Sequence, residues 1–305
     1  MLNENEDRLL PFYALSHLWG TSKENRHLWE EIGDYVDDEN GDPAEPVSMR
    51  SKKRNALLTL LCNYPDSYWW IDVLCARSDT PLGIMGDIYA CCYRCYAMVD
   101  YTFDQCSWWK RVWTWQEAAL PVEVLLIPET FTELSDSDML SIKDLQAFTG
   151  IGRIAYYTMI DQEDDSEGID DIKGMAFGWS TTHEISLSRN HCHIHSRYSS
   201  TLDGYFSLFE AFAVSPRQCM DPVDHVYGVL GIFQIEIPRK TDPNEVWQLF
   251  VTELLKLLTD PKRVMMIEDC EKEIISRYKS DRVRQCNLLT AKNMGEVYQC
   301  FIIDK

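Results

Sequence analysis

The sequence predicts an α/β fold in which helices flank a mostly parallel sheet, followed by a mainly helical C-terminal part. Between residues 12 and 127, apolar runs of strand length alternate with segments that carry apolar residues at helical spacing. Beyond Pro128 this alternation stops, and the clearest remaining pattern is helical. Strands that alternate with helices pair in parallel, because each helix brings the chain back to the same edge of the sheet.

The N-terminal elements follow from local patterns. A strand is predicted over residues 12–18 and a short helix over 24–32, and the acidic, proline-containing segment 34–47 is expected to be an exposed loop. Apolar residues at helical spacing predict a helix over 52–62, packed on the sheet. The near-continuous apolar run after it predicts a strand over 70–75 that is buried on both faces.

Two further pairs of helix and strand complete the predicted sheet. A helix is expected over 81–92, with its proline in the first turn, and the next strand over 96–101. Ser107 is expected to cap a helix over 108–120. The last predicted strand covers 122–127.

We therefore expect an α/β domain over residues 1–130 and a mainly helical extension over 131–305, packed on it. In the extension, apolar spacing predicts helices over 205–213 and 244–258. Residues 161–171 are rich in Asp, Glu, Ser and Gly, and we expect them to be a mobile acidic segment.

Composition and charge restrict the classes of partner. The chain has 305 residues, of which 45% are hydrophobic, and its formal net charge is −20. Such a charge repels the phosphates of nucleic acids and anionic lipids, which argues against a bulk electrostatic role on DNA, RNA or membranes. It also repels an anionic nucleotide at long range, so a nucleotide pocket needs local compensation from basic side chains or helix N-termini.

We expect a cytoplasmic protein with no membrane span. Residues 1–8 are polar and acidic, unlike a secretory signal, and no apolar run is long enough to cross a bilayer. The eleven Cys are therefore expected to be reduced, and many of them to be buried. Cys91, Cys92 and Cys95 include a C-x-x-C on a predicted helix without a partner pair, which is typical of packed thiols.

Four segments resemble, in the same order, the characteristic segments of the fungal heterokaryon-incompatibility (HET) domain. They are YALSHLWG at 13–20, WIDVLC at 70–75, MGDIY at 85–89 and RVWTWQE at 111–117. A fifth, DPVDHVYGVLG at 221–231, is similar to a stretch that is common downstream of HET domains. HET domains are remotely related to TIR domains, so the resemblance implies a TIR-like α/β domain.

The resemblance also implies a function. HET domains act in cell death after non-self recognition between fungal hyphae, and some TIR domains hydrolyse NAD with a glutamate on a helix that carries a Trp a few residues earlier. Trp113 and Glu117 match that arrangement. The resemblance thus implies an NAD glycohydrolase with Glu117 as catalytic carboxylate and NAD or a related nucleotide as substrate, not as cofactor. The alternative is a non-catalytic signalling module that acts by self-association or by binding a regulatory protein.

The residues themselves leave two interpretations of Glu117. Trp113 and Glu117 are four residues apart and share a helix face. A carboxylate beside an indole, near strand ends, is partly desolvated and poised toward a ribose hydroxyl or a developing oxocarbenium ion. In the alternative, Glu117 caps the helix or forms a local salt bridge while its neighbours make a buried stripe.

Further binding candidates lie at and after the end of the first predicted strand. Ser16 and His17 are expected to hydrogen-bond ribose or phosphate, and Gly20 to allow a close approach of the backbone. Trp19 or Trp113 is expected to stack on the nucleotide. The alternative is a strand that ends in a packed Trp and a turn glycine.

Asp72 interrupts an apolar strand, and a buried carboxylate must be paired. We expect it to form a structural ion pair or to orient Arg77, Arg111 or a substrate hydroxyl. Arg77 stands in Ala76-Arg77-Ser78, where HET domains usually have Ile-Asn-Gln. This departure puts a cation at the carboxyl edge of the sheet, where open α/β sheets bind ligands.

His191, His193 and His195 alternate, so on a strand they would project from one face, with Cys192 among them. This pattern is compatible with a zinc site or with a polar strand face. No further carboxylate or thiolate stands at suitable spacing, and we therefore predict no metal.

Overall fold

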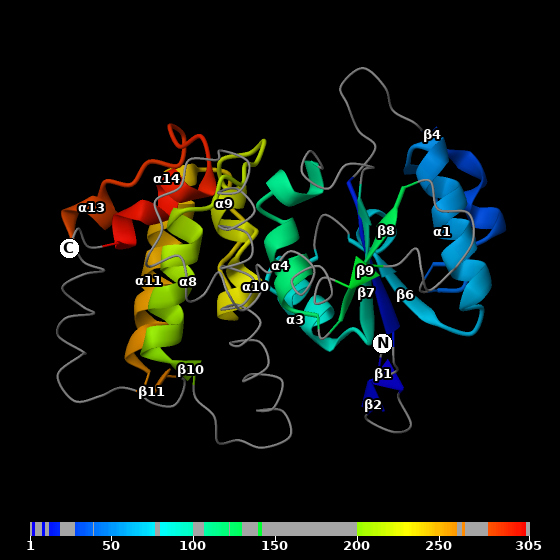
Figure 1. Ribbon diagram of the computed structural model, residues 1–305, viewed down its shortest axis with the longest axis horizontal. Coiled ribbons are helices and arrows are strands. Elements are labelled where there is room, and N and C mark those ends of the chain that lie inside the picture. Colours follow the sequence, from blue (N-terminus) through cyan, green and yellow to red (C-terminus); the bar gives the residue numbers. More distant parts are fainter. Residues whose placement is uncertain are drawn as a thin grey trace. The chain divides into compact units, whose positions relative to one another are not determined.

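The computed structural model describes residues 2–3, 8–9, 12–18, 28–38, 40–76, 80–99, 107–121, 123–129, 140–141, 200–260, 264–265 and 280–302. The chain forms two compact units, each with its own core (Figure 1). The first contains Met1–Thr80, Cys92–Trp108 and Pro121–Leu145, and the second contains Pro81–Cys91, Trp109–Leu120 and Gln146–Lys305.

The first unit is built on a five-stranded sheet with the order β6-β3-β7-β8-β9. Its strands are β3 (Phe12–Ser16), β6 (Tyr68–Ile71), β7 (Arg94–Val99), β8 (Val124–Pro128) and β9 (Leu140–Ser141). The first four pair in parallel, and β9 runs antiparallel to β8 at the edge. The predicted α/β class with a mostly parallel sheet is therefore confirmed.

The strand order creates a switch point at β3. The chain first adds β6 on one side of β3 and then crosses to add β7 and β8 on the other side. In open sheets of this kind, ligands bind beyond the carboxyl ends of the strands where the connections diverge. A ligand-binding site is therefore expected at the carboxyl edge of this sheet.

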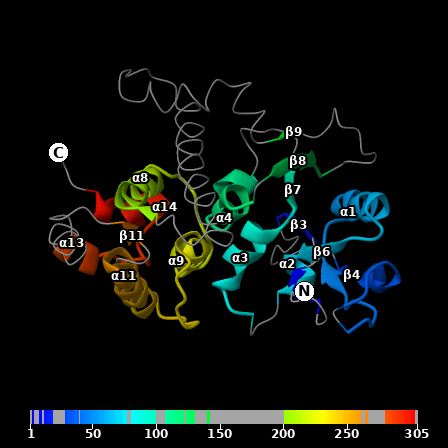
Figure 2. The same ribbon diagram turned by 90° about the horizontal axis from the view of Figure 1, so that it is seen from below.

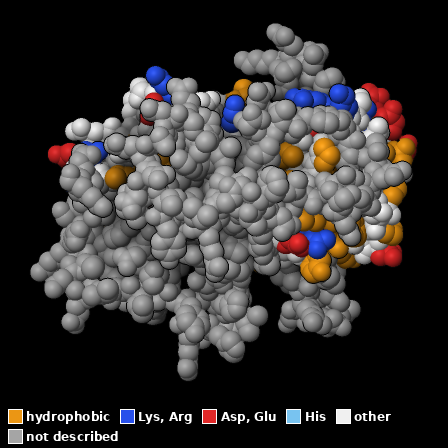
Figure 3. Space-filling model, viewed as in Figure 1, with side chains coloured by type: hydrophobic (Ala, Val, Ile, Leu, Met, Phe, Trp, Pro, Cys, Tyr) orange, Lys and Arg blue, Asp and Glu red, His pale blue; other side chains and the backbone are white. Residues whose placement is uncertain are grey.

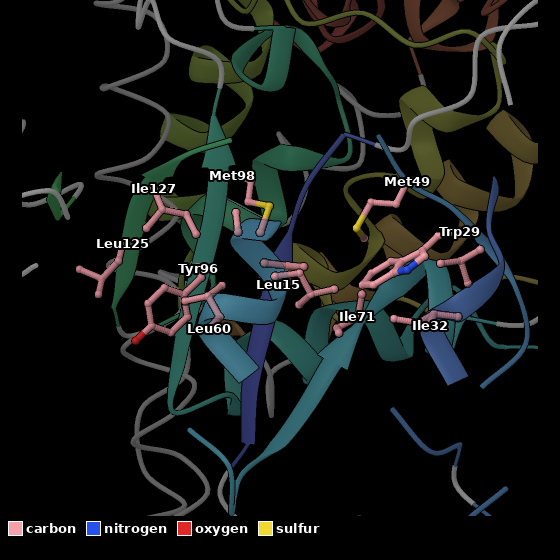
Figure 4. Close-up of a cluster of buried hydrophobic side chains, with 13 residues drawn as sticks. Leu15, Trp29, Ile32, Met49, Leu60, Ile71, Tyr96, Met98, Leu125 and Ile127 are labelled. Atoms are coloured by element: carbon pink, nitrogen blue, oxygen red, sulfur yellow. The ribbon is translucent and has the colours of Figure 1, made fainter. Parts of the chain in front are cut away.

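Helix α1 (Ser51–Asn63) covers one face of the sheet (Figure 2). Its residues Ala56 and Leu60 are fully buried, as predicted from their helical spacing. Tyr96 and Met98, alternate residues of β7, point to the same apolar cluster (Figure 4). Period-two alternation in the strands and helical spacing in α1 therefore meet in one core.

The N-terminal segment departs from the prediction of a helix over 24–32. The short elements of this region are β1 (Leu2–Asn3), β2 (Arg8–Leu9), β4 (Leu28–Trp29), the 3₁₀ helix η1 (Glu30–Asp34) and β5 (Val47–Ser48). Strand β4 pairs antiparallel with β5, and β1 with β2. Trp29 and Ile32 are buried in the core that includes residues of α1, so tertiary packing determines the structure of this segment.

The strand predicted over 70–75 ends earlier. Strand β6 stops at Ile71, and α2 (Asp72–Cys75) is a helical turn. The Oδ1 atom of Asp72 accepts a hydrogen bond of 2.8 Å from the backbone N–H of Val73. A carboxylate at the start of a helix stabilises that helix. The apolar run 70–75 therefore changes from strand to helical turn at Asp72, the one acidic residue in it.

The single helix predicted over 108–120 is two elements. They are the 3₁₀ helix η2 (Ser107–Lys110), which includes Ser107 instead of being capped by it, and α4 (Thr114–Ala119). Between them, Arg111 forms an isolated bridge with Gln218. Backbone hydrogen bonds to a distant segment therefore interrupt the helix that local propensity favours.

The second unit is mainly helical in the residues that the structure describes, as predicted for the C-terminal part. Its helices are α3 (Ile84–Cys91), α4, α8 (Leu202–Ala213), α9 (Asp224–Tyr227), α10 (Leu230–Phe233), α11 (Pro243–Thr259), α13 (Asp281–Arg284), α14 (Met294–Tyr298) and the 3₁₀ helix η3 (Gln299–Phe301). A short parallel pair joins β10 (Ser200–Thr201) to β11 (Val264–Met265). Asp242 caps α11 by accepting from the N–H of Asn244 at 2.8 Å.

Aromatic side chains form the core of the second unit. Phe209 of α8 stacks on Phe233 of α10, with ring centroids 5.4 Å apart. Phe212 of α8 and Tyr298 of α14 are 4.9 Å apart, and Phe250 of α11 lies 5.7 Å from Phe233. Offset and edge contacts of this kind stabilise beyond the area that they bury, so this core joins four helices.

Two glycines bring α3 and α10 into contact. A Cβ on Gly86 would lie 2.2 Å from the Cα of Gly231, and a Cβ on Gly231 would lie 2.3 Å from the Cα of Gly86. Only glycine allows backbones to approach this closely. This contact explains why residues 81–91 belong to the second unit, and why the division of the chain does not follow the expected cut at residue 130.

In the described ranges, no helix has both the length and the apolar composition needed to cross a membrane. The predicted acidic segment 161–171 lies outside the described residues.

Candidate functional site

Buried polar groups line the carboxyl ends of the strands in the first unit. We call them the carboxyl-edge network, which consists of Asp72, His17, the carbonyl of Leu18, Lys53 and Glu129. His17 directly follows β3, Asp72 follows β6 and Glu129 follows β8, whereas Lys53 stands in the first turn of α1. All four side chains belong to buried residues.

The first part of this network is a pair between an imidazole and a carboxylate. His17 Nε2 lies 3.3 Å from Asp72 Oδ1, and His17 Nδ1 lies 3.2 Å from the Leu18 carbonyl oxygen. Nε2 makes no directed hydrogen bond, so this is a close polar contact. Both ring nitrogens of His17 therefore face acceptor oxygens.

The second part is a buried ion pair. Lys53 Nζ donates to the Leu18 carbonyl oxygen and lies 2.9 Å from Glu129 Oε1. Lys53 is fully buried, and a buried ammonium is costly unless it is paired and hydrogen-bonded. Lys53 therefore ties the turn after β3 to both α1 and the end of β8, and this turn carries His17.

The N-terminus of α1 adds cations to the same edge. The Arg50 side chain is half exposed, with its guanidinium 4.0 Å from Glu129 Oε2, and Lys52 is exposed. The first turn of α1 has no acidic residue, and the leading N–H groups of a helix carry partial positive charge. Figure 3 shows Lys and Arg side chains gathered on the surface over this end of α1. The positive charge here contrasts with the net charge of −20.

Ser16 has a packing role in the first unit. Its hydroxyl accepts a hydrogen bond of 2.6 Å from Trp108 Nε1, and both residues are fully buried. This geometry fits the alternative in which β3 ends in packed side chains. Trp19, Gly20 and Arg77, which were also predicted to contribute to binding, lie outside the described residues.

Glu117 belongs to the second unit, where it is buried beside a guanidinium. Burial lowers the pKa of Arg217 to about 9, and the charge of Glu117 acts in the opposite direction. Arg217 Nη1 donates to the Arg111 carbonyl oxygen at 2.8 Å and to Thr114 Oγ1 at 2.6 Å. Its guanidinium also lies 5.0 Å from the ring centroid of Trp115. These contacts fit the interpretation of Glu117 as part of a local charge pair.

Trp113 and Arg111 also have partners in the second unit. Burial raises the pKa of Asp224, while a hydrogen bond from the Trp113 side chain and the charge of Arg111 lower it. A Cβ on Gly228 would lie 2.8 Å from Val112 Cγ1, so the two family-like segments that carry these residues pack closely. Trp113 is thus engaged as a hydrogen-bond donor.

The predicted site residues fall into two groups. Ser16, His17 and Asp72 belong to the first unit, and Arg111, Trp113 and Glu117 to the second. The structure pairs Asp72 with His17, whereas the sequence had suggested Arg77, Arg111 or a substrate hydroxyl as its partner.

Three buried charged residues were not predicted from the sequence. Lys53 stands three residues before Ala56 and therefore lies on the buried face of α1. A Lys at this spacing was a sign in the sequence that a cation is buried there. Glu129 directly follows the last parallel strand, and this position was a sign that it lies at the carboxyl edge of the sheet. Arg217 had no signal, because its partner Thr114 is remote in the sequence.

Among the residues that the structure describes, no three His, Cys, Asp or Glu side chains are grouped so that they could hold a metal ion. His191, His193 and His195 lie outside these residues, and both interpretations of them stay predictions.

Comparisons of the chain with protein-family models, with curated proteins and with solved structures found no match. The resemblance to HET domains therefore rests on the five segments quoted above.

Proposed function

We propose that the chain binds NAD or a related nucleotide at the carboxyl edge of the first unit and cleaves its nicotinamide–ribose bond, as a HET-type effector of cell death in the cytoplasm. The observation that carries this proposal is the carboxyl-edge network. Buried polar groups gather where open α/β sheets bind ligands. The combination of TIR-like sequence segments and this edge favours a nucleotide over other ligands.

We assign the phosphates of the nucleotide to the start of α1. Arg50 and Lys52 reach solvent there, and the helix N-terminus offers N–H groups. A chain with a net charge of −20 needs such local compensation for an anionic ligand.

We assign a ribose hydroxyl to Asp72. Its side chain is 13% exposed, compared with 8% for Glu129, so it is the more accessible carboxylate of the network. An ionised carboxylate accepts hydroxyl hydrogen bonds and stabilises positive charge that develops on the sugar. His17 is a positioning residue in this scheme, because it holds Asp72 from the interior.

A second candidate function follows from the surroundings of Glu117, a residue to which the scheme above gives no catalytic role. The HET resemblance implies that Glu117 is the catalytic carboxylate, whereas its position beside Arg217 favours a structural role. A carboxylate that compensates a buried guanidinium is needed for stability. This observation favours a non-catalytic signalling module that acts by self-association or through a regulatory protein.

The test is the release of nicotinamide from NAD by the purified full chain at high concentration, with a melting curve for each variant. Asp72→Asn is expected to lower turnover by on the order of 10²-fold, because it removes one preorganised charge. Glu123→Gln, at the opposite edge of the sheet, is the matched control and is expected to keep full turnover. A parent chain that neither binds nor cleaves NAD would contradict the proposal.

Glu117→Gln decides between the two roles of Glu117. If it melts like the parent and loses activity by on the order of 10²–10³-fold, Glu117 is the catalytic residue and the assignment of the chemistry to Asp72 is wrong. If its melting temperature falls, and the double variant Glu117→Gln with Arg217→Met regains it, the role of Glu117 is structural.

A further inference from the structure

Two thiols of the second unit lie in contact. The sulfur atoms of Cys286 and Cys300 converge on one oxygen atom, the carbonyl of Val297, at 3.6 and 3.1 Å. The two thiols also share a hydrogen bond. Cys286 follows α13 and Cys300 belongs to η3, so this contact joins two separate elements.

The shared hydrogen bond makes the two sulfurs chemically different. It lowers the pKa of Cys286, although burial acts in the opposite direction, and it raises the pKa of Cys300. Cys91 provides a contrast, because burial and the charge of Asp87 both raise its pKa. Since the thiolate is the reactive form, Cys286 is the better nucleophile.

Both thiols can be reached by a small polar reagent. They line an open pocket of about 390 Å³, whose wall also includes Arg282, Asn287 and Glu296. Both cysteines are free and half-buried. Proximity, a preferred nucleophile and access are the three conditions for a redox-active pair.

We propose that Cys286 and Cys300 form a reversible disulfide when the protein meets a peroxide. The Cys286 thiolate attacks one oxygen of hydrogen peroxide, the O–O bond breaks, and hydroxide leaves and takes up a proton. The Cys300 thiol then attacks the sulfenic sulfur, so that the S–S bond forms, the S–O bond breaks and water leaves with the thiol proton. The two thiols lose two electrons and two protons, and the peroxide is reduced to two water molecules.

The disulfide would fasten the C-terminal part of the second unit. It closes a loop that contains α14, whose Tyr298 packs on Phe212, and it holds η3, whose Phe301 lies 4.6 Å from Phe209. A cross-link that restricts the unfolded chain stabilises the folded state. This inference does not depend on the proposed nucleotide site, which belongs to the first unit.

The experiment uses the full chain, treated with hydrogen peroxide, alkylated and digested without reduction. Mass spectrometry is expected to find the peptides of Cys286 and Cys300 linked, with the loss of two hydrogen atoms and reversal by dithiothreitol. The oxidised protein is expected to melt a few degrees higher than the reduced protein. Cys219→Ser and Cys91→Ser are matched controls that should form the same cross-link.

A second measurement compares the reactivity of single thiols. When the reduced parent is alkylated for short times, Cys286 is expected to react faster than Cys91, although Cys91 is the more exposed of the two. In Cys300→Ser, peroxide is expected to leave a sulfenic acid on Cys286 that dimedone traps. A faster reaction at Cys91, a cross-link to another cysteine, or oxidation of Cys286 and Cys300 without a link to each other would overturn the proposal.

Discussion

The two units bury charge in different ways. In the first, the pairs of Lys53 with Glu129 and His17 with Asp72 lie along one edge of a sheet, and the network ends at a carboxylate that reaches solvent. In the second, Arg217 is buried beside Glu117 and bonded to the backbone and side chains of its own unit. The proposed binding site therefore lies at the network that has an accessible end, whereas the buried charge of the second unit is enclosed by packing.

The family-like segments divide in the same way. The segments at 13–20 and 70–75 carry His17 and Asp72, which meet at the carboxyl edge. The segments at 85–89, 111–117 and 221–231 meet in the second unit through glycine contacts and the Trp113–Asp224 hydrogen bond. The five segments that resemble the HET domain thus contribute to a candidate site in the first unit and to helix packing in the second.

The largest effect is expected at the carboxyl-edge network. Lys53→Met removes the ammonium and leaves Glu129 buried without it, which should lower the free energy of unfolding by about 4 kcal/mol. Lys52→Met, at the neighbouring exposed position, is the control and should change it by less than about 0.5 kcal/mol. Urea unfolding measures both. Equal stabilities of the two variants would refute the account of Lys53 as a buried structural cation.

The glycine contact of the second unit gives the next largest effect. Gly231→Ala places a methyl group against the backbone of Gly86, and overpacking of this kind should cost about 3 kcal/mol. Gly41→Ala in the first unit is the control, because no atom lies within 4 Å of its Cβ position and only its positive φ opposes alanine. That strain should cost about 1 kcal/mol. A smaller loss for Gly231→Ala than for Gly41→Ala would show that α3 and α10 do not touch.

Acid sensitivity is expected to come in part from His225 in the second unit. Burial lowers its pKa from 6.5 to about 4, and the charge of Glu296 acts in the opposite direction. Between these values the unfolded chain binds more protons than the folded protein. Stability is therefore lost as the pH falls from about 6.5 to about 4, by at most about 3 kcal/mol, and nothing is lost through this group above that range.

The measurement is the stability of the parent and of His225→Gln at several pH values. Asp224 has a raised pKa and acts in the opposite direction, so the informative quantity is the difference between the two proteins at each pH. This difference should shrink as the pH falls. Parallel pH profiles would rule out a neutral, buried His225.

The smallest effect is expected at the amino edge of the sheet. Arg94 Nε lies 2.6 Å from Glu123 Oε2, but both side chains are partly exposed. Arg94→Gln should therefore lower the free energy of unfolding by only about 0.5 kcal/mol, and high salt should reduce the difference further. A loss as large as that of Lys53→Met would mean that the two edges of the sheet do not differ in the way described.

Local patterns were sufficient for most of the sheet. The apolar runs of β7 and β8, which are buried on both faces, and the apolar stripe of α1 predicted these elements to within a few residues. The break after Lys110 was not predictable, since Gln218, which pairs with Arg111, is remote in the sequence. The end of β6 was missed because Asp72 was taken as an interruption of a strand and not as the start of a helical turn.

The candidate site was predictable in its position more than in its pairing. His17 was expected at a strand end, whereas Asp72 was expected inside a strand; the structure places both at the carboxyl ends of adjacent parallel strands. Their contact with each other depends on strand order, which periodicity does not determine. The partner of Lys53 is likewise set by the position of β8, two strands away from β3 in the sheet.

The interleaving of the two units along the chain has a consequence for synthesis on the ribosome. Helix α3 is made early, but Gly86 has no partner until Gly231 emerges much later. Contacts between distant segments form slowly, and apolar surface that waits for its partner is prone to aggregation. We expect the nascent second unit to depend on chaperones until α10 is synthesised. A chain cut at residue 130 should be poorly soluble, since α3 and α4 would lack their partners.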